Sequence, residues 1–144
     1  KNKVKFWIMN QFFIGIYIIR FEIIAMISFE RLVIFDKEFK RLLKKYRSLE
    51  KDLDVLKDAL ELFPTGQSNN SEIVFNSENV KVIKTRLFCR YLKGSTLRLT
   101  YAYHQEENKI CFMEIYFKGD KVNEDRERIK NYLKEISCPG NPDN

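Results

Sequence analysis

The sequence predicts an α+β domain: an N-terminal strand, a helical hairpin packed on an antiparallel β-sheet, and a C-terminal helix. Apolar residues recur at helical spacing between residues 39 and 63 and alternate at strand spacing between residues 80 and 117. The helical hairpin and the run of strands therefore occupy separate parts of the chain, as in α+β domains. A length of 144 residues favours one such domain with its own core.

Residues 1–25 are predicted to lie outside this domain. The apolar stretch 6–19 is interrupted by Asn10 and Gln11, and a membrane span needs about 20 apolar residues. No small-residue cleavage site follows the stretch. We interpret residues 1–25 as an upstream extension of the reading frame, with a lipid anchor or uncleaved signal as the alternative, and expect no membrane partner.

The domain is expected to cover residues 26–136. Residues 27–35, "ISFERLVIF", have the β-branched and aromatic composition of a strand, and Asp36 is placed to cap a helix after it. Apolar residues then recur at helical spacing up to Pro64, with a break at Arg47 and Ser48. Two helices joined so tightly form a hairpin with one apolar face to bury.

The second half of the domain is predicted to supply most of the sheet. Residues 64–79 have loop composition, with a short strand at 73–75. Asn123 is expected to cap a helix that runs to Ile136, and residues 137–144 are expected to form a disordered tail. The three main strands are predicted at residues 80–91, 97–104 and 110–117.

The stretch from residue 80 to 101, "VKVIKTRLFCRYLKGSTLRLTY", contains cations but no Asp or Glu. A solvated surface normally mixes both signs of charge, so this stretch indicates an anionic partner. The net charge of +6 agrees with such a partner. Residues 1–25 supply four basic residues and one acid, so without them the charge is +3, and the basic stretch matters as a local patch. Its cations are Lys81, Lys84, Arg86, Arg90, Lys93 and Arg98.

The cysteine count argues against a metal or disulfide framework. Three cysteines stand far apart, form no CxxC pair and have a single His to assist them. This usage is typical of a reducing cytosol. We predict no metal and no cofactor. We interpret His104 as a solvated residue beside a turn, too far from Arg98 along the strand to act on the same phosphate.

The strand alternation predicts which side chains face away from the helices. Leu97, Leu99, Tyr101 and Tyr103 share one face and must meet the hairpin. A three-residue connection, 106–108, would add Cys111, Met113, Ile115 and Phe117 to that face, whereas a two-residue connection would add Glu114, so we choose the first. Arg98 is then expected opposite Lys118.

If the neighbouring strand follows the same alternation, the open face collects several cations and one aromatic residue. Such a surface suits a nucleic-acid backbone, with the aromatic ring stacked on a base. The alternative is an ordinary solvated sheet face. The residues expected there are Lys84, Arg86, Arg98, Tyr116 and Lys118.

Residues 26–136 resemble the RelE/ParE superfamily of type II toxin-antitoxin toxins. The resemblance lies in the order of elements, the "KTR" and "LRLTY" strands, and above all the ending "IYFKGDKVNEDRERIKNYL". It implies a cytoplasmic bacterial toxin inhibited by a cognate antitoxin, with operator DNA bound through that antitoxin. RelE-type members cleave mRNA on the ribosome, and ParE-type members inhibit DNA gyrase.

The resemblance also assigns residues to a site. Lys84 and Arg86 match basic residues of one strand, Arg98 matches an Arg after a turn, and Lys118 and Lys121 match basic residues that end the last strand. The chain departs from the family pattern at Val82, where some members carry a further Lys, and it does not end on His or Tyr.

Ribonuclease chemistry assigns roles to these residues. The ribose 2′-hydroxyl is the nucleophile, so the protein must supply a base, an acid and a group that stabilises the phosphorane. Arg98 is the expected stabiliser because its fork can bind two phosphate oxygens. Lys84 is a base candidate if crowded cations depress its pKa, with Glu114 as the carboxylate alternative. Arg86, Tyr116, Lys118 and Lys121 are expected to bind the nucleic acid.

Three functions remain open from the sequence. The first is a ribosome-dependent mRNA endoribonuclease, which the density of cations favours. The second is a ParE-like gyrase inhibitor that acts by binding without catalysis. The third is an inactive relative that binds only an antitoxin.

Overall fold

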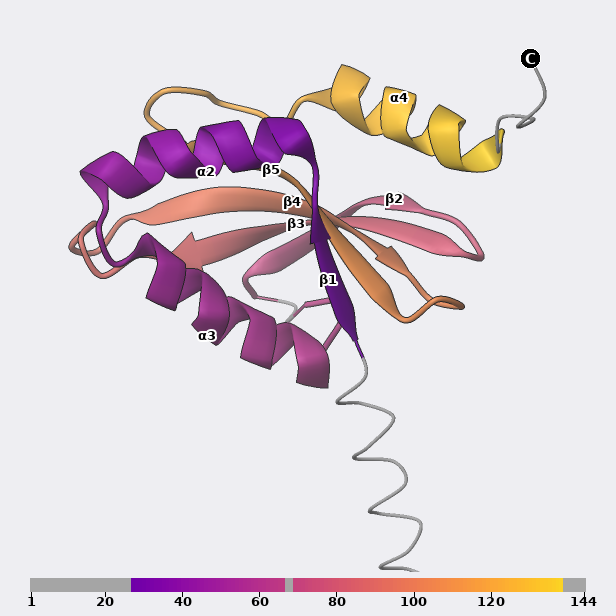
Figure 1. Cartoon of the computed structure of the whole chain (residues 1–144), viewed down its shortest axis with the longest axis horizontal. Helices are drawn as coiled ribbons and strands as arrows, with labels where there is room; N and C mark the ends of the chain where they lie inside the picture. The colour runs from indigo at the N-terminus through magenta and orange to yellow at the C-terminus, as the bar shows by residue number, and fades with distance from the viewer. Residues whose placement is uncertain (1–26, 67–68, 139–144) are drawn as a thin grey trace, which may run out of the picture.

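The computed structural model describes residues 27–66 and 69–138. They form a five-stranded sheet in the order β1-β5-β4-β3-β2, with three helices (Figure 1). The expected α+β class is therefore confirmed. The elements are β1 Ser28–Arg31, α2 Val33–Lys45, α3 Leu49–Leu62, β2 Ser71–Asn76, β3 Val80–Phe88, β4 Thr96–His104, β5 Lys109–Phe117 and α4 Arg126–Ser137.

The two faces of the sheet are covered differently (Figure 1). Helices α2 and α3 pack on one face, where Phe35, Phe39 and Phe112 form a stack of rings and Leu99 is fully buried. Helix α4 packs on the other face, where Ile129 joins a smaller apolar cluster from β3, β4 and β5. Because α4 covers only part of this second face, the rest is left for polar side chains.

The N-terminal strand is shorter than predicted and is paired differently. It runs parallel to β5, so the sheet is mixed and not purely antiparallel. After Arg31, the Leu32 N–H still bonds to Phe112 O at 3.0 Å, but the Asp36 N–H already bonds to Leu32 O at 3.0 Å. Leu32 therefore caps the helix, Asp36 lies in its first turn, and Phe35 becomes a helical core residue.

The predicted faces of β5 are right at one end of the strand and wrong at the other. Leu97 pairs with Phe117 and Leu99 with Ile115, and Ile115 and Phe117 face the helices as predicted, but a β-bulge follows between Thr100 and Tyr101. The bulge puts an extra residue in β5 and reverses its alternation. Met113 therefore packs on the α4 side with Val82 and Ala102. Cys111 pairs with Ala102, also contrary to the prediction.

Two predictions concern residues that the structure does not describe. They are the interpretation of residues 1–25 and, for residues 139–144, the predicted tail. Residue 137 still belongs to α4, and the N-cap of this helix is Asp125, not Asn123: its Oδ1 accepts the Arg128 N–H at 3.0 Å. Within residues 27–66 and 69–138, no helix is long and apolar enough to cross a bilayer.

Candidate nucleic-acid interface

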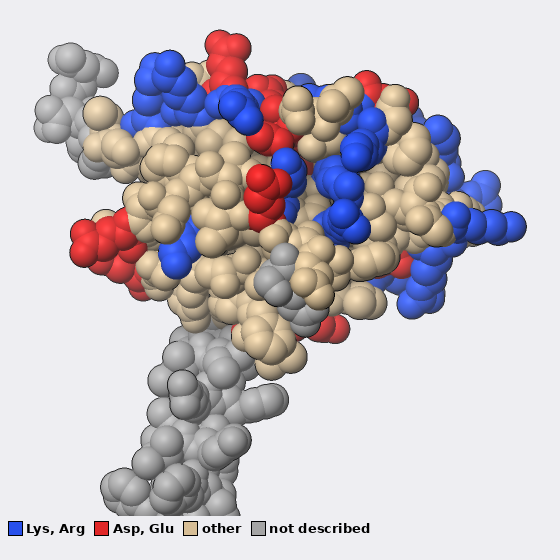
Figure 2. All heavy atoms as spheres, turned by 180° about the vertical axis from the view of Figure 1, so that it is seen from behind, with Lys and Arg blue, Asp and Glu red and all other residues tan. Residues whose placement is uncertain are grey.

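A hollow of about 400 Å³ lies on the sheet face opposite α2 and α3, beside the loop that leads to α4. Figure 2 shows Lys and Arg side chains gathered in a band on the face seen there, with acidic atoms beside them. We call this feature the basic hollow. Its lining consists of Asn69, Asn70, Ser71, Glu72, Lys84, Thr85, Arg86, Arg98, Tyr116, Lys118, Val122 and Asn123.

The strand register places the charged side chains in one row. Arg86 of β3 lies opposite Arg98 of β4, and Arg98 lies opposite Tyr116 of β5. The alternation that buries Ile83 and Leu87 against the helices turns Arg86 to the other face. The predicted gathering of cations on this face is confirmed, with one correction: Arg98 faces Tyr116, and Lys118 lies in the turn after β5.

Three cations of the basic hollow have no carboxylate partner in the described part of the chain. No ion pair involves Arg86, Arg98 or Lys118 there, although Arg98 donates a hydrogen bond to Thr96 Oγ1 at 2.9 Å. Like charges directly opposite each other on paired strands are destabilising. The Arg86 and Arg98 pair is therefore poised to gain from a bound anion.

Lys84 differs from these three because it is held by two carboxylates. Its Nζ lies 3.1 Å from Glu72 Oε2 and 3.0 Å from Glu124 Oε2. Burial on its own lowers the pKa of Lys84, but the hydrogen bonds and charges of Glu124 and Glu72 outweigh it, so the pKa is raised. The expectation that crowded cations depress this pKa is wrong. Lys84 stays an ammonium at neutral pH and is no general base.

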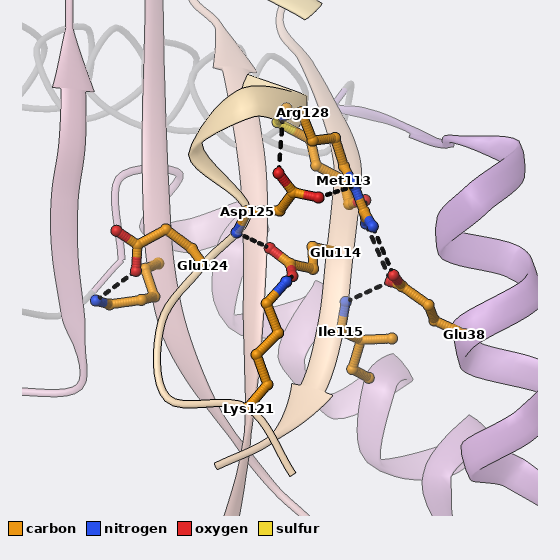
Figure 3. A network of polar contacts seen from close by, with 9 residues as sticks. Glu38, Met113, Glu114, Ile115, Lys121, Glu124, Asp125 and Arg128 are labelled. Atoms are coloured by element: carbon orange, nitrogen blue, oxygen red, sulfur yellow. Dashed lines mark hydrogen bonds and ion pairs between the residues drawn. The ribbon is translucent and has the colours of Figure 1, made fainter. Parts of the chain in front are cut away.

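Glu114 lies opposite Thr100 on the same sheet face as Tyr116, but it does not line the basic hollow. Its side chain is 2% exposed, it accepts the Asp125 N–H at 2.9 Å, and it pairs with Lys121 (Figure 3). Lys121 is likewise outside the lining. The carboxylate that does line the hollow is Glu72, whose side chain is 70% exposed.

Tyr116 lines the hollow but is only 5% exposed. The Lys121 ammonium lies 5.5 Å from the centre of its ring. Burial, reinforced by the charge of Glu114, raises the pKa of Tyr116, so the phenol stays protonated. A ring covered to this extent is not the open stacking platform that the sequence predicted.

A second cluster of charges, which we call the α4 clamp, holds the start of α4 (Figure 3). The Arg128 guanidinium binds Glu38 of α2 at 2.7 and 3.1 Å and Met113 O at 2.9 Å. Glu38 Oε2 also accepts the Ile115 N–H at 3.1 Å. The α4 clamp comprises Glu38, Glu114, Lys121, Glu124, Asp125 and Arg128.

Sequence reasoning missed Glu38, Glu72, Glu124 and Arg128. The "NEDRERI" ending carries part of the family resemblance, but nothing in its spacing identifies its charges as partners of β3, β5 and α2. Glu38 and Arg128 are separated by 90 residues, so no local spacing links them. The one available signal was the mixture of both signs just before a predicted helix.

His104 is also placed differently from its prediction. It is buried under α4, and its Nε2 lies 2.7 Å from the Tyr132 hydroxyl. Burial lowers the pKa of His104, the charge of Lys109 adds to this, and Glu107 and Glu30 oppose it. The neutral imidazole therefore joins α4 to β4, away from the basic hollow. Within the described ranges, no group of His, Cys, Asp and Glu could hold a metal ion.

Comparison with known proteins gives a distant structural similarity. No family model matches the chain, and no curated protein matches it. Among solved structures, the chain is similar to one in an archaeal RelE-RelB complex from Pyrococcus horikoshii OT3. The identity is 13%, the TM-score is 0.48, and the match covers 64% of this chain and 94% of the other. A similarity this distant does not by itself assign an activity.

Proposed function

We propose that this chain is the toxin of a type II toxin-antitoxin system and cleaves mRNA on the ribosome. The observation that carries the proposal is that Arg86, Arg98 and Lys118, three cations without an ion pair among the residues described, line one hollow. A chain of phosphates supplies the counter-charges that these residues lack. The sequence resemblance to RelE-type toxins supports the same conclusion.

The proposed reaction is an attack by the ribose 2′-hydroxyl on the adjacent phosphorus. Glu72 accepts the hydroxyl proton, since it is the carboxylate of the hollow lining. The 2′-oxygen forms a bond to phosphorus, and Arg98 binds the phosphorane oxygens through its fork. The bond to the 5′-oxygen then breaks, Lys84 donates a proton to that oxygen, and a 2′,3′-cyclic phosphate and a 5′-hydroxyl result.

The other predicted residues take supporting roles in this proposal. Arg86 and Lys118 bind phosphates on either side of the scissile bond. Tyr116 lines the hollow as a neutral phenol. Glu114 and Lys121, predicted to act on RNA, instead position the loop that carries Glu124, the partner of Lys84.

The proposed partners follow from the same assignment. A cognate antitoxin would neutralise the basic hollow, and operator DNA would be bound through that antitoxin. Action on translating ribosomes places the toxin in the cytoplasm.

A second candidate is a gyrase inhibitor that binds without catalysis. The pairing of Lys84 with Glu72 and Glu124 favours it, because this pairing ties up both proton-transfer groups of the proposed reaction in the unbound protein. RNA cleavage requires that a bound phosphate displace at least one of these contacts. Gyrase inhibition has no such requirement.

The test is a short pulse of expression of the full chain in a bacterium, followed by mapping of mRNA 5′ ends. New ends within translated frames are expected with the natural chain and with Lys93→Ala, a matched control from the same basic stretch but outside the hollow lining. Arg98→Ala should produce none. Growth arrest with intact messages and broken DNA would support the gyrase candidate instead, and no arrest would contradict both.

A further inference from the structure

We propose that two carboxamides, Asn70 and Asn123, recognise one RNA base in the basic hollow and prefer adenine. The inference rests on the proposed function, since it takes RNA as the ligand of this hollow. It adds base recognition to a site whose cations, as described above, account only for binding of the backbone.

Asn70 is held in place in the turn directly before β2. Its carbonyl accepts the Arg86 N–H at 3.0 Å and the Thr85 hydroxyl at 3.3 Å. The next residue, Ser71, pairs with Thr85 through hydroxyl groups 2.8 Å apart. Three polar contacts therefore fix the backbone on one wall of the hollow, beside Arg86.

Asn123 belongs to the loop between β5 and α4, which supplies another wall. The residues on its C-terminal side are fixed: Glu124 binds Lys84 at 3.0 Å, and the Asp125 N–H binds Glu114 at 2.9 Å. Asn123 itself is exposed. The α4 clamp thus positions a carboxamide whose own side chain remains available.

Neither carboxamide has a side-chain hydrogen bond to any residue in ranges 27–66 and 69–138. Each offers an acceptor and two donors next to cations that bind only acceptors. The hollow volume of about 400 Å³ falls within the usual range for small-ligand pockets, roughly 300–1,000 Å³. The space therefore admits a base as well as a phosphate.

The chemistry of the carboxamide indicates which base is preferred. An Asn side chain can donate to N7 and accept from N6 of adenine in one bidentate contact. Guanine presents two acceptors on that edge, and pyrimidines have no N7, so neither offers the same match. Because Asn70 and Asn123 lie on two walls of the hollow, one amide can contact the N6 and N7 edge of adenine while the other contacts a further polar atom of the same nucleotide.

The test measures binding of the purified full chain to two fluorescently labelled hexanucleotides, one of adenosine and one of uridine. Both carry 2′-O-methyl groups, which remove the nucleophile and prevent cleavage. The natural chain should bind the adenosine oligomer about tenfold more tightly. Asn70→Ala and Asn123→Ala should each lower this ratio severalfold and leave binding of the uridine oligomer unchanged.

Two control variants separate this inference from the proposed function. Asn131→Ala alters an exposed carboxamide of α4 outside the hollow lining and should keep the ratio. Arg98→Ala should weaken binding of the adenosine and uridine oligomers by the same factor. Equal binding of both oligomers by the natural chain, or a ratio unchanged in both hollow variants, would overturn the inference and leave the proposed function standing. Failure of the natural chain to bind either oligomer would overturn both.

Discussion

The basic hollow and the α4 clamp are built from the same kinds of residue, yet their charges are used differently. Lys118 and Lys121 stand three positions apart, but Lys118 lines the hollow without an ion pair among the residues described, whereas Lys121 binds the buried Glu114. Charge density alone therefore does not locate a ligand site in this chain. Charges that already have a partner within the fold form a structural cluster, whereas charges without one form a binding surface.

This difference has an energetic basis. A charge moved out of water loses solvation, and a partly buried ion is tolerated only where hydrogen bonds and an opposite charge compensate. The clamp supplies such compensation for Glu38, Glu114 and Arg128. Removal of one partner should therefore be costly in the clamp and nearly neutral for folding in the hollow.

The largest effect on stability is expected from Arg128→Ala. The variant leaves Glu38 without its bidentate partner and Met113 O without a donor. Arg128 and Glu38 are partly buried, with side chains 13% and 20% exposed. Loss of Arg128 should therefore cost about 2 kcal/mol, and urea unfolding measures it. The matched control is Lys130→Ala in the same helix, an exposed residue without an ion pair among the residues described, for which a change within about 0.5 kcal/mol is expected. Equal effects of the two would contradict the distinction between clamp and surface.

A smaller effect with a defined pH dependence is expected from Glu124→Gln. Burial alone would raise the pKa of Glu124, but its backbone hydrogen bond and Lys84 lower it below the usual 4.5. The folded state therefore gains stability above the unfolded value and loses it as pH falls through the lower folded value. Glu124→Gln should lower stability by about 1 kcal/mol at neutral pH and flatten the loss below pH 4.5. A natural chain whose acid unfolding matches the variant would argue against this ion pair.

The smallest effect is expected at the contact between His104 and Tyr132. The pKa of His104 is lowered from 6.5 by burial first and Lys109 second. Below pH 6.5 His104 binds a proton in the unfolded state but stays neutral in the folded state. The free energy of unfolding therefore falls as the pH is lowered, until the folded pKa is reached. His104→Gln should remove this dependence between about pH 7 and 5, as thermal unfolding can measure. An unchanged slope would place the titrating group elsewhere.

The sequence predicted most of the fold because the alternation in β3 and β4 is regular. Ile83, Leu87, Leu97 and Leu99 all face the helices as their spacing required. The bulge near Met113 and the parallel pairing of β1 were not predictable, since both depend on how distant strands meet. The predicted start of α2 was too late because the β-branched residues at 33 and 34 locally favour a strand. In the structure these residues are helical, since the helix buries Phe35 in the core of the hairpin.

The sequence predicted which face of the sheet carries the candidate site, but it did not predict which of the charges there already have ion-pair partners. The alternation of side chains along the strands correctly placed Lys84, Arg86 and Arg98 on one face. It could not show that Lys84 and Glu114 are already paired, because their partners come from β2 and from the loop before α4. Long-range ion pairs of this kind have no spacing rule.

The most direct test of the central claim is the salt dependence of RNA binding. The unpaired cations should contact phosphates, so each of Arg86→Ala, Arg98→Ala and Lys118→Ala should reduce the slope of log affinity against log salt by about 0.7. Lys93→Ala should leave the slope unchanged, and all four variants should unfold at the same urea concentration as the natural chain. A triple variant of Arg86, Arg98 and Lys118 that binds RNA with the natural slope would contradict the claim that this hollow binds a nucleic-acid backbone.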